Sequence, residues 1–153
     1  MSSQPRTVHS QKRKVLFLCT GNSCRSQMAE AWVNNLKSNE WKAFSAGIET
    51  HGMNPYAISV MAESGVDMSD QYSKHVEELK DQHFDLVVTV CDHAANHCPS
   101  IPSSIAVKHI PFDDPPALAK NANNEAETLV SYRMVRDQIK TFVESEQLST
   151  AVS

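Results

Sequence analysis

A short stretch with a cysteine at its start and an arginine near its end constrains the fold of this chain more than any other feature. Its sequence, Cys19-Thr20-Gly21-Asn22-Ser23-Cys24-Arg25-Ser26, follows the apolar run Val15–Leu18 and precedes a segment with helical periodicity. Between a strand and a helix, such a loop can curl so that its backbone N–H groups point inward around an anion. The arginine on the helix can then grip two oxygens side by side. The sequence therefore predicts an oxyanion-binding loop over residues 19–26.

Individual residues of this loop suggest specific roles. We expect Gly21 to adopt a positive φ, Asn22 to tolerate the left-handed region, and Ser26 to hydrogen-bond the Cys19 sulfur. The helix N-terminus and Arg25 should lower the pKa of Cys19 and make it a nucleophile. The alternative is a buried cysteine that only packs. The order of strand, loop and helix favours the nucleophile.

Length and charge restrict the kind of protein. A chain of 153 residues fits one domain, which we place at residues 14–146, between a polar extension at 1–13 and a frayed end at 147–153. A net charge of -4 gives no general attraction to nucleic acid or anionic lipid. No segment has the apolar length of a signal peptide or a membrane span. We therefore expect a cytoplasmic protein that binds neither nucleic acid nor a membrane, and we expect a monomer.

Apolar runs alternate with helical patterns along the chain. The predicted strands are Val15–Leu18, Trp41–Ala46, Phe84–Val90 and Ile105–Ile110. The predicted helices cover residues 25–38, 55–64, a short piece within 74–80, and a long C-terminal segment marked by Leu129, Tyr132, Val135, Ile139, Phe142 and Val143. Helices that connect strands in this way cover both faces of a parallel sheet through right-handed crossovers. We therefore predict an α/β fold with a four-stranded parallel sheet and helices on both faces.

The helix over residues 55–64 has the clearest predicted ends. Asn54 supplies an N-cap, Pro55 the first helical position, and Gly65 the stop. Its expected buried stripe is Ile58, Met61 and Ala62.

Two further cysteines, Cys91 and Cys98, follow the third predicted strand. They lie seven residues apart, or about 10.5 Å along a helix. A disulfide needs Cα atoms within about 7 Å, so a redox role requires this segment to unwind. His93 and His97 are residue types that zinc accepts, but the cysteine spacing is wider than in usual zinc knuckles and no second Cys/His pair follows. We therefore expect solvated histidines, no metal and no other cofactor.

An acidic pair follows the fourth predicted strand. An acid before proline is often turn chemistry, but Asp114 follows a strand end, as Cys19 and Cys91 do, so all three can converge at one edge of the sheet. A leaving oxygen at that edge would need a proton. We favour Asp114 over Asp113 as the general acid.

Several segments together resemble the thioredoxin-coupled arsenate reductases, which have the fold of low-molecular-weight protein tyrosine phosphatases. The matching parts are residues 19–30, residues 45–52, the Cys91/Cys98 pair and residues 112–115, within a likeness that spans about residues 14–144. The resemblance implies Arg25 and Ser26 as partners of the anion and the thiolate. It also implies that Cys24 has no required catalytic role.

The resemblance implies a reaction as well. Arsenate enters the loop, where phosphate and sulfate compete, and Cys19 attacks arsenic while Asp114 helps a hydroxide leave as water. Cys91 then attacks Cys19 of the adduct, arsenite leaves, and Cys98 takes over the disulfide, which thioredoxin reduces.

Two other functions remain open at this point. A phosphatase acting on phosphotyrosine or a small phosphoester needs only Cys19, Arg25 and Asp114, although such enzymes commonly have an aromatic residue near the acid where this chain has Pro116. The nonenzymatic alternative is an oxyanion- or metal-sensing module built on cysteine and histidine ligands.

One position departs from the pattern of the family. In many relatives a potassium ion near the loop is held by residues that match Asn22, Glu30 and Ser45 together with an aspartate, and this chain has Lys74 at the aspartate position. An ammonium in place of a carboxylate should exclude potassium. Either the Lys74 ammonium occupies that space and pairs with Glu30, or Lys74 points into solvent.

Overall fold

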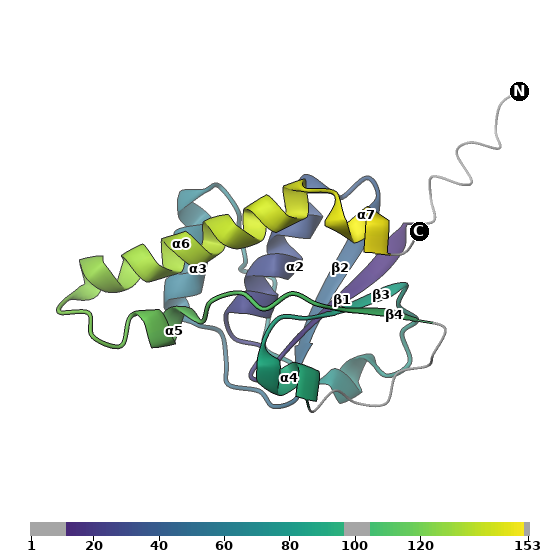
Figure 1. Cartoon of the computed structure of the whole chain (residues 1–153), viewed down its shortest axis with the longest axis horizontal. Helices are drawn as coiled ribbons and strands as arrows, with labels where there is room; N and C mark the ends of the chain where they lie inside the picture. Colours follow the sequence, from purple (N-terminus) through teal and green to yellow (C-terminus); the bar gives the residue numbers. More distant parts are fainter. Residues whose placement is uncertain (1–11, 97–104, 152–153) are drawn as a thin grey trace, which may run out of the picture.

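A sheet of four parallel strands in the order β2-β1-β3-β4 forms the centre of the molecule (Figure 1). The computed structural model describes residues 12–96 and 105–151. Its strands are β1 (Arg13–Cys19), β2 (Trp41–Gly47), β3 (Leu86–Thr89) and β4 (Ala106–His109). All four predicted strands are present and all pair in parallel, so the predicted fold class is confirmed.

The two central strands are buried on both faces because their apolar runs are continuous. Val15 to Leu18 in β1 and the whole of β3 are buried. The edge strand β4 differs, because its residues alternate between half-buried and exposed and Val107 is exposed. The other edge strand, β2, is mostly buried, so edge position alone does not produce this pattern.

Helices cover both faces of the sheet. The connection from β1 to β2 runs through α2 (Arg25–Leu36), and that from β3 to β4 runs through α4 (Asp92–Asn96). These connections leave the centre of the sheet in opposite directions, so right-handed crossovers place α2 and α4 on opposite faces. In Figure 1, α6 (Glu125–Glu144) lies along α2 on one side, while α4 lies on the other.

The predicted ends of α3 (Pro55–Glu63) are confirmed, but its predicted buried stripe is right only at Met61 and wrong at Ile58 and Ala62. The Asn54 side chain caps the helix, and Gly65 follows it at φ +79°. Ile58 is 37 % exposed and Ala62 is exposed, whereas Ala57, Val60 and Met61 are buried. The helix turns this face inward because it packs against α6, which its own sequence does not specify.

The predicted frayed end is wrong over residues 147–151, where the chain forms α7 (Gln147–Ala151). Glu146 takes a left-handed φ of 69° that ends α6 and turns the chain. Leu148 is then only 2 % exposed, and the Ser149 hydroxyl accepts a hydrogen bond from Arg13 at 3.5 Å. The burial of Leu148 and the contact of Ser149 with Arg13 help to secure this end, while residues 152–153 and 1–11 lie outside the described part of the chain.

The remaining elements are short. The short helix predicted within residues 74–80 is present as the 3₁₀ helix η1 (Val76–Leu79), whose Val76 and Leu79 pack against the core. Helix α5 (Pro115–Leu118) follows the acidic loop. Within residues 12–96 and 105–151, no helix combines the length and apolar character needed to cross a membrane. The strand order reverses between β1 and β3, so Cys19, the last residue of β1, and Cys91, two residues after β3, meet where ligands of such sheets bind.

Candidate active site

The segment after β2 holds the loop from outside. Four of its N–H groups donate to loop carbonyl oxygens at 2.8–3.2 Å: Ile48 to Cys19, Glu49 to Thr20, His51 to Gly21 and Asn54 to Ser23. A trans peptide points its N–H away from its carbonyl, so the N–H groups that follow these carbonyls face the inner side of the loop. This arrangement is compatible with the predicted concave nest of N–H groups that an oxyanion requires.

Asn22 is the turning point of the loop. Its φ is 50°, which confirms the predicted left-handed conformation. Its Oδ1 accepts hydrogen bonds from the Lys74 N–H and from Gln27 Nε2, each at 2.8 Å, and its Nδ2 donates to Ser26 Oγ at 2.9 Å. Ser26 therefore accepts a hydrogen bond that holds the Asn22 side chain in place. The predicted hydrogen bond from Ser26 to the Cys19 sulfur stays a prediction.

Gly21 does not have the predicted positive φ. A glycine is needed at this position for a different reason, which is close packing. A Cβ at Gly21 would overlap the His51 imidazole. The same holds at Gly47, where a Cβ would lie 2.8 Å from the Thr20 carbonyl oxygen and 2.9 Å from the Asn22 nitrogen. Both glycines thus allow the segment after β2 to approach the loop.

Arg25 connects the loop to the ends of β3 and β4. Its Nη1 donates to the Phe112 carbonyl at 3.1 Å and to the Val90 carbonyl at 3.4 Å, and its Nη2 lies 3.6 Å from Asp114 Oδ1. The Asp113 carboxylate instead accepts a hydrogen bond from Gln138 at 2.9 Å. The structure therefore brings Asp114, and not Asp113, to the arginine.

Two buried thiols lie next to each other at the base of the loop. Cys91 Sγ lies 3.2 Å from Thr20 Oγ1 and 3.4 Å from the Ala94 nitrogen. A hydrogen bond from Cys19, together with those from Thr20 and the Ala94 N–H, lowers the pKa of Cys91 to about 5. The same bond to Cys91, together with burial, raises the pKa of Cys19, although Arg25 opposes the shift.

The prediction that Cys19 carries the lowered pKa is therefore wrong for the loop without an anion. Three donors converge on the Cys91 sulfur, so the negative charge resides there and Cys19 holds the shared proton. Only the fold places the two thiols together. Thr20, whose hydroxyl contacts Cys91, was assigned to the loop but not to this role, and no spacing signal could have revealed it.

Cys24 has a different environment. Burial raises its pKa to about 12, with a further contribution from the Asp114 charge, although Arg25 lowers it. A thiol that stays protonated is a poor nucleophile, which agrees with the expectation that Cys24 has no required catalytic role.

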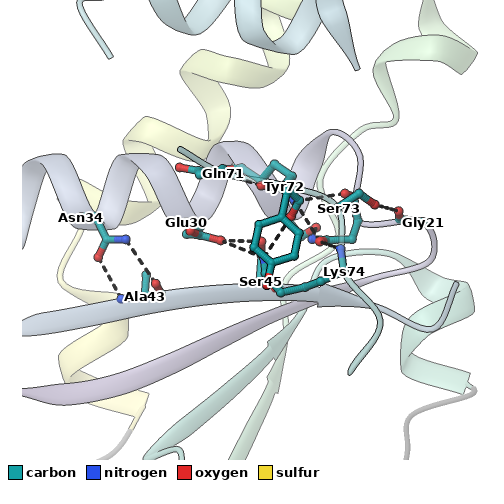
Figure 2. Close-up of polar contacts among 12 residues, drawn as sticks. Gly21, Glu30, Asn34, Ala43, Ser45, Gln71, Tyr72, Ser73 and Lys74 are labelled. Carbon is teal, nitrogen blue, oxygen red and sulfur yellow. Dashed lines mark hydrogen bonds and ion pairs between the residues drawn. The ribbon is translucent and has the colours of Figure 1, made fainter. Parts of the chain in front are cut away.

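The other predicted site residues divide into two groups. Cys98 and His97, and the side chain of His93, lie outside the described residues. In the described ranges, no group of three or more His, Cys, Asp or Glu side chains could hold a metal ion. Glu30, Ser45 and Lys74 gather behind the loop near Asn22. Figure 2 shows Glu30, Ser45 and Lys74 together.

Gln27 is fully buried and hydrogen-bonded to Asn22, and it was not predicted from the sequence. A glutamine beside core-facing Met28 was a usable signal for it.

The charge on Cys91 predicts a measurable titration. In protein carrying Cys98→Ser, absorbance at 240 nm should show one thiolate forming with a midpoint near pH 5, because Cys91 is the acidic member of the pair. Adding Cys91→Ser should remove this step. It should also lower the pKa of Cys19, since the bond to Cys91 that raises it is gone. A first thiolate that forms only above about pH 8, as in an ordinary cysteine, would contradict the assignment.

Comparisons with known proteins agree with this geometry. Residues 14–152 match the family model described as low molecular weight phosphotyrosine protein phosphatase. An arsenate reductase of Halalkalibacterium halodurans is 48 % identical over 138 residues, which cover 88 % of this chain and 97 % of that protein. A solved arsenate reductase in its phosphate-binding state superposes with a TM-score of 0.70 at 30 % identity, covering 92 % of this chain and 99 % of the other. A thioredoxin-dependent arsenate reductase of Corynebacterium glutamicum shares the fold with a TM-score of 0.66 at 23 % identity, over 95 % of this chain and 67 % of that one.

Proposed function

Because the chain belongs to the low molecular weight phosphotyrosine protein phosphatase family, we propose that it uses the loop of this family to reduce arsenate to arsenite. The second thiol beside Cys19 is the observation that carries the proposal. A phosphatase needs one cysteine nucleophile, whereas a two-electron reduction needs a second thiolate that can attack the first sulfur. Cys91 is such a thiolate, with its pKa lowered to about 5 by its hydrogen-bond donors, first among them Cys19.

The first step forms the bond between sulfur and arsenic. Arsenate occupies the N–H nest, and the shared proton moves from Cys19 to Cys91 along their hydrogen bond. The Cys19 sulfur attacks arsenic, one arsenic–oxygen bond breaks, and a proton from Asp114 lets that oxygen leave as water. The Asp114 side chain is 47 % exposed, so it can take up a proton from solvent for the next cycle. Arg25, whose Nη2 lies 3.6 Å from Asp114, supplies the guanidinium that binds the remaining oxygens in this proposal.

The second step transfers the electrons. Cys91 loses its borrowed proton to solvent, and the Thr20 hydroxyl and the Ala94 N–H still stabilise the resulting thiolate. This thiolate attacks the Cys19 sulfur, and the sulfur–arsenic bond breaks with its electron pair on arsenic. Arsenic(V) becomes arsenic(III) and leaves as arsenite, and a Cys19–Cys91 disulfide remains.

The third step passes the disulfide to Cys98. Cys98 attacks the Cys91 sulfur and frees Cys19, and thioredoxin reduces the Cys91–Cys98 disulfide in turn. Helix α4 (Asp92–Asn96) lies between these cysteines, so it has to unwind before their Cα atoms can approach within about 7 Å. The cysteine pattern supports thioredoxin as the reductant and the reducing cytoplasm as the compartment. The one catalytic domain then extends beyond residue 146 through α7, because Leu148 belongs to the core.

A panel of two assays tests the proposal. The protein is combined with thioredoxin, thioredoxin reductase and NADPH, and NADPH oxidation is followed with and without arsenate. Hydrolysis of para-nitrophenyl phosphate is measured in parallel. We expect oxidation that depends on arsenate, on thioredoxin and on the protein. Phosphoester hydrolysis without any arsenate-dependent oxidation would replace this proposal by the phosphatase.

A further inference from the structure

The Lys74 side chain ends in a polar cage behind the loop. It is only 10 % exposed, and its Nζ donates to the Tyr72 carbonyl at 3.0 Å and to the Ser45 carbonyl at 3.1 Å. The same nitrogen lies 4.0 Å from Glu30 Oε1 and 4.6 Å from the centre of the Tyr72 ring. Figure 2 shows Lys74 under the Tyr72 ring, with Ser45 and Glu30 beside it. The solvent-facing alternative for Lys74 is therefore wrong.

Glu30 is the charge that this ammonium faces. Its side chain is 14 % exposed and accepts a hydrogen bond from Ser45 Oγ at 2.6 Å. Burial raises the pKa of Glu30, while the bond from Ser45 and the charge of Lys74 lower it. A buried carboxylate is unfavourable without an opposite charge, so Lys74 compensates Glu30.

The backbone of Lys74 connects this cage to the loop. Its N–H donates to Asn22 Oδ1 at 2.8 Å, and its carbonyl accepts from the Gly47 N–H at 2.8 Å. The preceding residue, Ser73, donates its hydroxyl to the Gly21 carbonyl at 3.0 Å. Any movement of residues 72–74 would therefore withdraw two bonds from the loop at once, one of them to the left-handed Asn22.

We propose that Lys74 is a positioning residue whose ammonium serves as a built-in cation: it neutralises Glu30, holds residues 72–74 against α2 and β2, and so keeps the oxyanion loop in shape without an alkali ion. The residues do not fit the potassium site of the family. Potassium would need oxygen ligands that the ammonium already engages, Ser45 and Glu30 among them, and it would lie against a like charge.

This inference concerns the shape of the loop, so it does not depend on arsenate chemistry. Its probe is inorganic phosphate, and its variants are Lys74→Met, which keeps the stem without the charge, and Lys74→Asp, which restores a cation ligand. Lys120→Met, at an exposed lysine, is the matched control. Phosphate affinity by calorimetry and the melting temperature are measured in choline, sodium and potassium chloride at equal ionic strength.

The two Lys74 variants should respond differently to potassium. Wild type and Lys120→Met should bind phosphate equally in all three salts. Lys74→Met should bind about tenfold more weakly in every salt, the order expected when a charge-assisted hydrogen bond is lost. Lys74→Asp should be as weak in choline but should recover affinity and melting temperature specifically in potassium. A merely structural role for Lys74 would not produce this potassium recovery.

Three results would overturn the inference. One is a wild-type protein that binds phosphate more tightly in potassium than in sodium. Another is a Lys74→Met protein that matches wild type in affinity and melting temperature. The third is a Lys74→Asp protein without any potassium response, and this decides the matter even where Lys74→Met does not fold. If wild type bound no phosphate, the proposed function would fail, while the melting temperatures would still test Lys74.

Discussion

Replacing Cys19 with serine is expected to lower the rates of arsenate reduction and of any phosphoester hydrolysis by at least about a thousandfold. Serine has no acidic proton to share with Cys91, and its hydroxyl is a weak nucleophile without an adjacent base. The N–H nest remains, so phosphate binding by calorimetry should persist. The loss should therefore appear in the rate of the chemical step, measured as arsenite formed per enzyme.

Cys24→Ser is the matched control in the same loop. Burial raises the pKa of Cys24 to about 12, so its thiol stays protonated and takes no part in the reaction. This variant should keep activity within a few-fold of wild type. If Cys24→Ser lost activity and Cys19→Ser kept it, the two cysteines would have to exchange roles.

Replacing Cys98 with serine should stop the enzyme after one turnover. In the proposed relay the first two steps use only Cys19 and Cys91, so each enzyme should release one arsenite and then stall with these two sulfurs joined. Peptide mapping under nonreducing conditions should identify that disulfide. Sustained turnover with thioredoxin by this variant would show that Cys98 is not needed to pass the disulfide on.

Cys91→Ser provides the complementary result. Without the second thiolate, Cys19 can still form its bond to arsenic, but no sulfur can displace the arsenic with its electron pair. This variant should release no arsenite. Release of arsenite from Cys91→Ser would mean that another thiol performs the second step.

The loop could be predicted from sequence because its determinants are local. The loop lies between strand β1 and helix α2, which are close to each other in the sequence. Asn22 tolerates the left-handed conformation, and Arg25 begins the helix. Of the two candidate acids, the structure places Asp114 and not Asp113 beside Arg25, while the general-acid role of Asp114 stays a prediction.

The charge of the thiols could not be predicted in the same way. Cys19 and Cys91 are far apart in the sequence, and the donors to Cys91 come from the loop, through Cys19 and Thr20, and from α4, through Ala94. Sequence reasoning assigned the lowered pKa to the residue nearest the helix N-terminus and Arg25. It could not account for a second thiol that competes for the same proton.

Long-range packing explains the other errors. The buried face of α3 depends on α6, so the apolar spacing of Ile58 did not reveal it. Residues 147–151 form a helix because the Leu148 side chain packs into the core. The short polar sequence around Leu148 does not predict this contact. Lys74 is the opposite case: a cation at an unusual position suggested a role, and the structure places its ammonium beside Glu30.

The most direct test of the account is a single turnover of the reduced wild-type protein with arsenate and no thioredoxin. Arsenite and free thiols are counted together after the reaction stops. The account predicts one arsenite released and two thiols lost for each enzyme, because the electrons come from one pair of cysteines. Arsenate that returns unreduced while every thiol remains free would contradict it.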